Sequence, residues 1–367
     1  MQRKIFYIIQ GSLLMCVLVS YPLWFNDRAV PLASAVDVLV FKGWLHVGTL
    51  AVWGMLFLAS FWKFRKPSVL ITFLFVSLIL ALQDQLRWQP WFYQYLLMIS
   101  FYVLYTAKRI RHIDFRNVIR LILIGSYVWA GIHKYNAAFI EEFIPKILQT
   151  EIVWLGYLLP VIETLLAIGL IPQRTRRIST VGLMIMHLLI LIAVINGSMR
   201  FNLVLIPWNL GLMILVFILF WYQEKRAGFE LDRAVLSKSI ALLLTIILPS
   251  LNFVGYWDSY LSFSLYSEKT DKAYFFVSDE FKQRFSEESQ QLFDMENKIY
   301  VQKLAYSELN TPMYPERRVY IEIFEKFCSE ADQNFDIIIQ LQTMPNPLKN
   351  EWKKETIFCE DIGYSFE

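Results

Sequence analysis

Nine apolar stretches, separated by short loops that carry most of the charge, make up the first 255 residues of the chain. A helix needs about 20 consecutive apolar residues to cross the hydrocarbon core of a bilayer. The third and fourth stretches are shorter, so they either extend into their flanks or form a re-entrant pair. The pattern predicts an all-α polytopic membrane bundle of about nine transmembrane helices, at residues 5–25, 43–62, 68–83, 91–106, 118–137, 152–171, 178–196, 201–222 and 237–254.

The pattern changes after residue 255 to that of a small α+β domain. Residues 273–277, 298–304 and 335–341 are rich in β-branched and aromatic side chains, which predicts strands. Residues 316–331 place apolar side chains on one helix face. We therefore expect a transmembrane helical domain over residues 1–255 and an extracytoplasmic α+β domain over residues 256–367.

Basic side chains gather at the start of the chain and in the loops after the second, fourth, sixth and eighth stretches. An excess of Lys and Arg marks the cytoplasmic side of a membrane protein. We therefore expect a cytoplasmic N-terminus and a C-terminal domain on the opposite side. The residues are Arg3, Lys4, Lys63, Arg65, Lys66, Lys108, Arg109, Arg111, Arg116, Arg120, Arg174, Arg176, Arg177, Lys225, Arg226, Arg233 and Lys238.

Composition agrees with a membrane body and an acidic tail. Hydrophobic residues make up 56% of the chain and charged residues 18%, against about 25% charged residues in soluble proteins. Residues 257–367 contain 12 basic and 21 acidic residues, a net charge of −9, whereas the rest contains 23 and 11, a net charge of +12. An acidic tail on a basic membrane body argues against nucleic acid as a partner.

The three cysteines divide between the two parts of the chain. Cys16 lies in the first apolar stretch, and Cys328 and Cys359 both lie in the tail. A domain outside the cytoplasm is exposed to oxidising conditions that allow a disulfide. The two tail cysteines either form such a bond or remain buried thiols.

Ionisable side chains inside the apolar stretches are the candidates for chemistry, because a charge in lipid costs several kcal/mol. Lys134 lies near the outer end of the fifth stretch, on one helix face with Tyr127 and Gly131. An amine held in a groove of low dielectric is a candidate base. Alternatively, Lys134 extends to the membrane interface beside the aromatic residues Trp129 and Tyr135.

Other polar residues lie at comparable depth. Glu163 and His187, midway along two stretches joined by a short turn, either grip the polar group of a ligand or form a structural interhelical hydrogen bond. Asp84 and Arg87 form a local ion pair or contact a substrate. The four histidines lie on separate segments, so no metal site is expected. Further candidates for binding a ligand in an outward-facing cavity are His133, Asn196, Arg200 and Asn202.

Residues 130–139 read AGIHKYNAAF, and Glu163, Gly169 and His187 follow on the next two stretches. This arrangement, over about residues 75–222, resembles the vitamin K-dependent γ-carboxylases and their bacterial relatives with the HTTM domain. The resemblance implies that Lys134 is the base that deprotonates a quinol. It also implies a bacterial inner-membrane protein with a periplasmic C-terminal domain. The glycine–lysine and mid-helix glutamate patterns are also similar to those of DoxX-like membrane proteins, which implies a quinol-associated subunit without catalysis of its own.

Two functional hypotheses follow. In the first, the protein acts on or binds a quinol or another lipid-like ligand, with Lys134 as the base. In the second, it is a non-enzymatic membrane subunit whose C-terminal domain docks a protein partner outside. A transporter is a weaker third hypothesis, because no inverted repeat is visible in the sequence.

Overall fold

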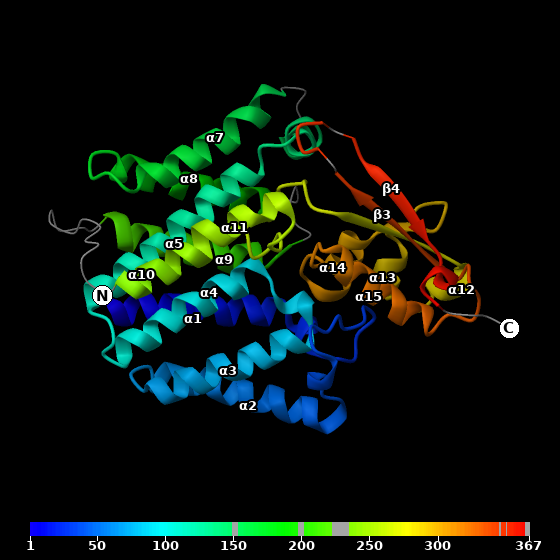
Figure 1. Cartoon of the computed structure of the whole chain (residues 1–367), viewed down its shortest axis with the longest axis horizontal. Helices are drawn as coiled ribbons and strands as arrows, with labels where there is room; N and C mark the ends of the chain where they lie inside the picture. Colours follow the sequence, from blue (N-terminus) through cyan, green and yellow to red (C-terminus); the bar gives the residue numbers. More distant parts are fainter. Residues whose placement is uncertain (149–152, 197–201, 222–234, 345, 350, 364–367) are drawn as a thin grey trace.

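The computed structural model describes residues 1–148, 153–196, 202–221, 235–344, 346–349 and 351–363. It is mostly helical, with a small four-stranded sheet towards the C-terminus (Figure 1). Among these residues, five helices are long and apolar enough to cross a membrane: Gln2–Val19, Gly43–Trp62, His112–His133, Arg176–Ile195 and Leu236–Val254. The chain is therefore a multi-pass membrane protein. The expectation of nine spans is met only in part, because the remaining helices have 17 or fewer consecutive described residues.

Every apolar stretch of the sequence nevertheless folds as a helix, with ends that differ from expectation by a few residues. The first helix ends early, at Val19, and a short 3-10 helix with Pro22 in its first turn follows over Tyr21–Trp24. The last long helix runs through three helical segments, with Pro249 inside it. The helices are α1 (Gln2–Val19), α2 (Gly43–Trp62), α3 (Pro67–Gln83), α4 (Pro90–Thr106), α5 (His112–His133), α6 (Ile144–Leu148), α7 (Trp154–Gly169), α8 (Arg176–Ile195), α9 (Leu205–Val216), α10 (Val235–Leu242) and α11 (Leu248–Ser250).

Six of these helices close into a ring. Going round it, α4 packs on α5, α5 on α7, α7 on α8, α8 on α9, α9 on α1, and α1 on α4. The hairpin of α2 and α3 packs on the ring through α4, and α10 packs on it through α5 (Figure 1). Polar side chains on these helices can therefore face one another across the ring instead of facing lipid.

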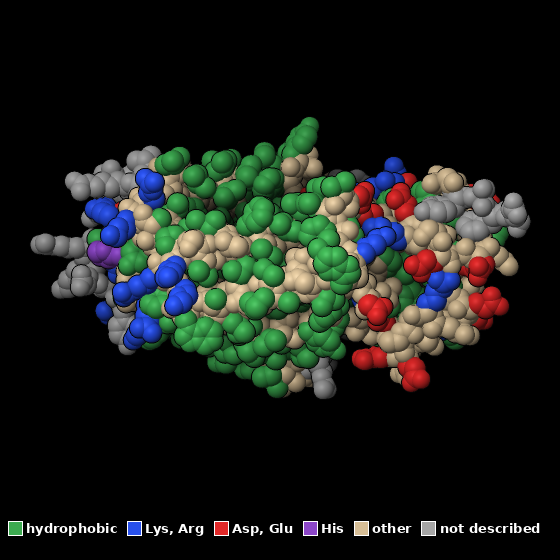
Figure 2. Space-filling view, turned by 90° about the horizontal axis from the view of Figure 1, so that it is seen from below, with side chains coloured by type: hydrophobic (Ala, Val, Ile, Leu, Met, Phe, Trp, Pro, Cys, Tyr) green, Lys and Arg blue, Asp and Glu red, His purple; other side chains and the backbone are tan. Residues whose placement is uncertain are grey.

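The two ends of the helical part differ in charge. Figure 2 shows Lys and Arg side chains gathered at the end far from the sheet, a broad hydrophobic band in the middle, and acidic side chains on the C-terminal part. The basic end holds the start of α1 and the loops that follow α2 and α4. This separation agrees with the charge pattern that the positive-inside rule describes.

The C-terminal part is an antiparallel sheet with helices on one face. Its strand order is β2–β1–β3–β4, and Tyr274 pairs with Tyr300 on one side of β1 and with Gln340 on the other. Alternate residues of β1 are buried, on the face that α14 covers. The elements are β1 (Lys272–Val277), α12 (Asp279–Lys282), α13 (Glu287–Gln290), β2 (Lys298–Tyr300), α14 (Val301–Leu309), α15 (Arg317–Cys328), β3 (Ile337–Thr343) and β4 (Lys353–Ile357).

Two expectations for this part need correction. The strand expected at residues 298–304 ends at Tyr300, and α14 begins at Val301 because its apolar residues recur at helical spacing. Strand β4 was not expected, because its residues 353–357 are mostly charged and exposed. Charged side chains are typical of an edge strand, where they discourage pairing with another chain.

A disulfide joins Cys328, at the end of α15, to Cys359, just after β4. The bond ties the main helix of the C-terminal part to the last described turn of the chain. Cys16 is a free thiol buried in α1.

Helix α15 uses two faces. Val319, Ile323 and Phe324 are fully buried in the core of the C-terminal part. Helix α15 lies beside the end of the helical part that is nearest the sheet (Figure 1). On another face it carries a polar stripe, with residues four apart along the helix, that reaches the loops at this end. The contacts of this stripe join Arg318 Nε to Gln85 Oε1 at 2.9 Å, the backbone N–H of Ser34 to Glu322 Oε1 at 2.6 Å, and Lys326 Nζ to the carbonyl of Leu32.

Further hydrogen bonds hold the two parts together away from α15. The Asn310 amide donates to the carbonyl of Val19, at the end of α1, and the Gln89 amide donates to the carbonyl of Pro312. On the other side, the backbone N–H of Ala137 donates to the carbonyl of Pro347. We call this set of contacts, together with those of the α15 stripe, the clamp. Because the clamp engages several helix ends at once, it fixes the C-terminal part on the helical part.

Glu316 lies next to the clamp, at the start of α15. It accepts a hydrogen bond of 2.7 Å from the backbone N–H of Ser259, and its neighbour Arg318 binds Asp258. Burial, together with the negative charge of Asp258, raises the pKa of the Glu316 carboxyl from 4.5 to about 7. The folded protein therefore holds a proton there more tightly than the unfolded chain does.

The disulfide predicts a particular pattern of thiol labelling. In denaturant without reductant, only Cys16 should react with a maleimide, and after reduction all three cysteines should react. Mass spectrometry of the intact protein counts the labels. Three labels before reduction would contradict the bond.

The raised pKa of Glu316 predicts that stability falls as pH rises. The stabilising contribution is complete below the unfolded pKa of 4.5 and is lost as the pH passes through about 7, at a cost on the order of 3 kcal/mol. Melting curves of the detergent-solubilised protein between about pH 5 and about pH 8 measure this. Glu316→Gln should flatten the curve, and the exposed control Glu351→Gln should not. Equal slopes for both variants would refute this account.

Candidate functional site

The structure pairs Lys134 with Glu163 and places His187 in a separate hydrogen-bonded group. Lys134 caps the C-terminal end of α5, and its ammonium lies 2.6 Å from Glu163 Oε2 on α7. The Lys134 side chain is 17% exposed and that of Glu163 8%, so both charges are largely removed from solvent. Each charge neutralises the other, which allows both to lie at the edge of the ring.

Gly131 explains how α5 and α7 approach closely enough for this pair. A Cβ atom at position 131 would lie about 3.0 Å from the carbonyl of Pro160 and closer still to the hydroxyl of Thr164. Real side chains do not tolerate such contacts, so a larger residue would push the helices apart. Helix α7 occupies the space beside Gly131 on this face of α5.

His187 belongs to a second group in the ring, formed by α5, α8 and α9. Its Nε2 lies 2.6 Å from the hydroxyl of Tyr127, and its Nδ1 lies 2.7 Å from Asn209 Oδ1. The Asn209 amide donates to the carbonyl of Leu205, which leaves its oxygen to face the ring. In this arrangement, Nδ1 of His187 carries the hydrogen and Nε2 accepts the hydrogen bond from Tyr127.

A third polar group joins α4, α5 and α9. Trp208 Nε1 donates to Gln94 Oε1 at 3.0 Å, and Gln94 Nε2 donates to the hydroxyl of Ser126 at 2.9 Å. Ser126 precedes Tyr127 on α5, and Trp208 precedes Asn209 on α9. The second and third groups therefore share two helices, and together they place bonded polar side chains inside the ring.

The remaining bundle candidates lie elsewhere. His133 is 1% exposed, and its ring stacks on Trp129 instead of joining Lys134. Asn196 is exposed at the end of α8, and Arg200 lies outside the described residues. Asn202 donates a hydrogen bond of 2.6 Å to the hydroxyl of Tyr266, in the segment that leads to β1. These residues do not form a single cavity with Lys134 in the described part of the chain.

Asp84 and Arg87 form a buried cluster with a partner that sequence reasoning missed. The closest ion pair of Asp84 is with Arg28, at 2.7 Å, whereas Arg87 lies 3.7 Å away. Arg87 donates instead to the backbone carbonyls of Leu23, Leu80 and Trp24. The cluster holds the loop between α1 and α2 in the shape that receives the α15 stripe.

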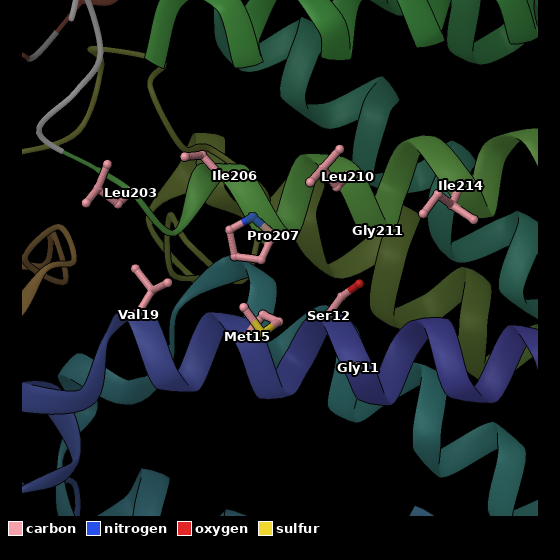
Figure 3. Close-up of a pocket in the computed structure, with 10 residues that line it drawn as sticks. All are labelled: Gly11, Ser12, Met15, Val19, Leu203, Ile206, Pro207, Leu210, Gly211 and Ile214. Atoms are coloured by element: carbon pink, nitrogen blue, oxygen red, sulfur yellow. The ribbon is translucent and has the colours of Figure 1, made fainter. Parts of the chain in front are cut away.

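A shallow groove lies between α1 and α9. Figure 3 shows Ser12 and Met15 of α1 facing Pro207 and Leu210 of α9. The groove has a volume of about 380 Å³, and Ser12 supplies the one polar side chain of its lining. Its chemistry suits a lipid acyl chain, in keeping with its place on the hydrophobic band.

A larger hollow lies between the C-terminal part and the segment 142–147 of the helical part. Its volume is about 1080 Å³, and its other walls come from residues 260–274, 288–292 and 300–310, with Leu203. Five tyrosines line it, so we call it the tyrosine cleft. Nothing in the sequence pattern marked it, because its walls come from four separate segments and Leu203.

Comparison with known proteins gives one finding. A family model described as methylamine utilisation protein MauE matches residues 113–205, which contain Tyr127, Lys134, Glu163 and His187. No curated protein matches the chain, and neither does a solved structure. The match covers about a quarter of the chain, from α5 to the start of α9.

This finding corrects the resemblance stated from the sequence. The expected kinship with HTTM-domain and γ-carboxylase-like proteins, or with DoxX-like proteins, was wrong, because the matching family is a different one. The motif around Lys134 is short and built from residues that are common in membrane helices. The quinol chemistry that the resemblance implied for Lys134 therefore loses its support.

The pair of Lys134 and Glu163 predicts a rescue experiment. Lys134→Met or Glu163→Gln alone leaves one buried charge without its partner, which typically costs about 3–5 kcal/mol. The double variant removes both charges and should recover most of the loss. Thermal melting in detergent measures the three variants. A double variant no more stable than the weaker single variant would show that the pair does not hold α5 to α7.

Proposed function

We propose that this chain is a membrane accessory protein that holds a folded extracytoplasmic part at the membrane surface and uses it to dock a protein partner. The match to the methylamine utilisation protein family over residues 113–205 supports a membrane accessory role for the helical part. In this proposal, residues 1–255 form the membrane domain and residues 256–367 the docking domain.

The observation that carries the proposal is the clamp. A domain that needed no fixed position on the membrane part would require only the covalent link between the two parts. Here Arg318, Glu322 and Lys326 of one helix all engage loops of the helical part. Such engagement keeps the tyrosine cleft at a fixed position beside the outer ends of α5 and α7. A fixed surface suits a partner that must be met in one orientation, because little ordering is left to occur on binding.

The orientation is part of the proposal. The basic end of the helical part would face the cytoplasm, and the clamp end would face outwards. An oxidising compartment on the outer side accords with the disulfide of Cys328 and Cys359. We propose the inner membrane of a bacterium, with a periplasmic C-terminal domain, as the location.

The polar groups of the ring have a structural role in this proposal. The pair of Lys134 and Glu163 and the group around His187 join α5 to α7, α8 and α9 through charge and hydrogen bonds. Bonds of this kind hold helices together where lipid competes for apolar contacts. A role of Lys134 as a base stays a prediction, which turnover of a defined substrate by Lys134→Met would test.

Photo-crosslinking in intact cells tests the docking role. A photo-reactive amino acid at Lys303, exposed on the wall of the tyrosine cleft, should give a discrete crosslinked protein. The same group at Lys349, exposed and outside the cleft, is the matched control. Gel shift and mass spectrometry identify the product.

The clamp provides the second arm of this experiment. Combining the probe at Lys303 with Arg318→Ala and Glu322→Ala should loosen the C-terminal part and reduce the crosslink several-fold. A probe at Lys303 that gives no product, or the same products as the probe at Lys349, would overturn the proposed function.

A further inference from the structure

The tyrosine cleft has the surface of a recognition site. Tyr260, Tyr266, Tyr274, Tyr300 and Tyr306 line it, together with apolar side chains such as Leu292. Tyrosine offers a large, rigid contact area with a polar end, and it loses little entropy on binding. For this reason it is enriched where proteins recognise other polypeptides.

Two pairs of rings already define the walls. Tyr274 and Tyr300 face each other across β1 and β2 with ring centroids 5.1 Å apart. Tyr266 stacks on Phe143 of the helical part at 6.3 Å. One wall thus belongs to the sheet, and the other is built jointly with the segment before α6. The cleft would lose its shape if the clamp released the C-terminal part.

The charges of the cleft balance. Its lining includes the basic residues Lys146, Lys272 and Lys303 and the acidic residues Glu142, Glu268 and Glu288. Lys272 and Glu268 pair with each other at 3.2 Å. Lys146, Lys303 and Glu288 are exposed and form no ion pair within the described part of the chain. A lining without net charge does not favour phosphate, nucleotide or nucleic acid, whereas single charges of both signs suit a polypeptide.

The size of the cleft points in the same direction. Small-molecule pockets have volumes of about 300–1,000 Å³ and lining that is mostly apolar. The tyrosine cleft, at about 1080 Å³, is slightly above this range and is polar as well as aromatic, with Thr270 among its residues. Hydroxyl groups such as that of Thr270 can pair with the N–H and C=O groups that an extended chain leaves unbonded.

A bound chain would not add to the sheet as a further strand beside β2, the edge strand that borders the cleft. The backbone N–H and C=O of Lys298, on the edge strand β2, are already bonded to Asp294. The strand then ends at Tyr300, where α14 begins. Recognition therefore falls to the side chains of the cleft.

We infer that the tyrosine cleft binds an extended segment of a polypeptide that carries no net charge. An aromatic or aliphatic side chain of this segment lies among the tyrosines. Lys146 and Lys303 meet an acidic residue of that segment, and Glu288 meets a basic one. This inference rests on the proposed function, since it names the part of the partner that the docking domain recognises.

An array of synthetic 12-residue peptides tests the inference, with the full-length protein in lipid nanodiscs as the labelled probe. Peptides that contain an aromatic residue beside single acidic and basic residues should bind. Tyr274→Ala together with Tyr300→Ala should weaken that binding by at least tenfold, as expected for aromatic anchors. Lys349→Glu, a charge reversal outside the cleft, should leave it unchanged.

Charge reversal separates recognition from a loss of folding. Lys146→Glu with Lys303→Glu changes two exposed side chains and should shift preference from peptides with an acidic residue to peptides with an additional basic residue. A preference that does not shift, or the absence of any peptide binding, overturns the inference. Binding to oligosaccharides on a parallel glycan array, in place of peptides, also overturns it. A crosslink at Lys303 without peptide binding would leave the docking role standing and remove only the extended segment.

Discussion

The structure depends on the cost of leaving polar groups unpaired in lipid. Without water in the bilayer core, a buried charge or hydrogen-bonding side chain is costly unless it has a partner. The ring of six helices supplies these partners, since Lys134 meets Glu163 and His187 meets Tyr127 and Asn209. The rule also acts just after α3, where buried Asp84 and Arg87 are satisfied by Arg28 and by backbone carbonyls. Ion pairs and hydrogen bonds therefore orient the helices of the ring and shape the loops at the end nearest the sheet.

The loops that contact α15 in turn position the C-terminal part. Buried Asp84 accepts a hydrogen bond from the backbone N–H of Ala33, one residue before Ser34, which binds Glu322 of α15. Asp84, which the sequence placed in a local ion pair with Arg87, thus holds the loop that the clamp contacts. The clamp then determines the shape of the tyrosine cleft, because one cleft wall belongs to each part. Helix packing thus determines the shape of the loops, and the loops determine the shape of the cleft.

The helical part was predictable because runs of apolar residues show where helices form. Their rotation was not, because the sequence does not say which face of a helix meets which neighbour. Glu163 and His187 were expected at similar depth, yet Glu163 turns towards α5, and His187 reaches Tyr127 and Asn209. The ion pair of Arg28 was not predicted, because its partner Asp84 lies 56 residues away along the chain. The charged strand β4 was missed because its pattern belongs to an edge, not to a core.

The bonds from α15 to the loop after α1 join residues 288 and 294 positions apart. Helix α15 therefore docks on a loop that precedes it by most of the membrane part of the chain. Contacts of such long separation form late in folding, since the loop between them must close first. Docking of α15 therefore requires that the loop after α1 is already folded. The cleft is therefore complete only when the loops that α15 contacts have taken their folded shape.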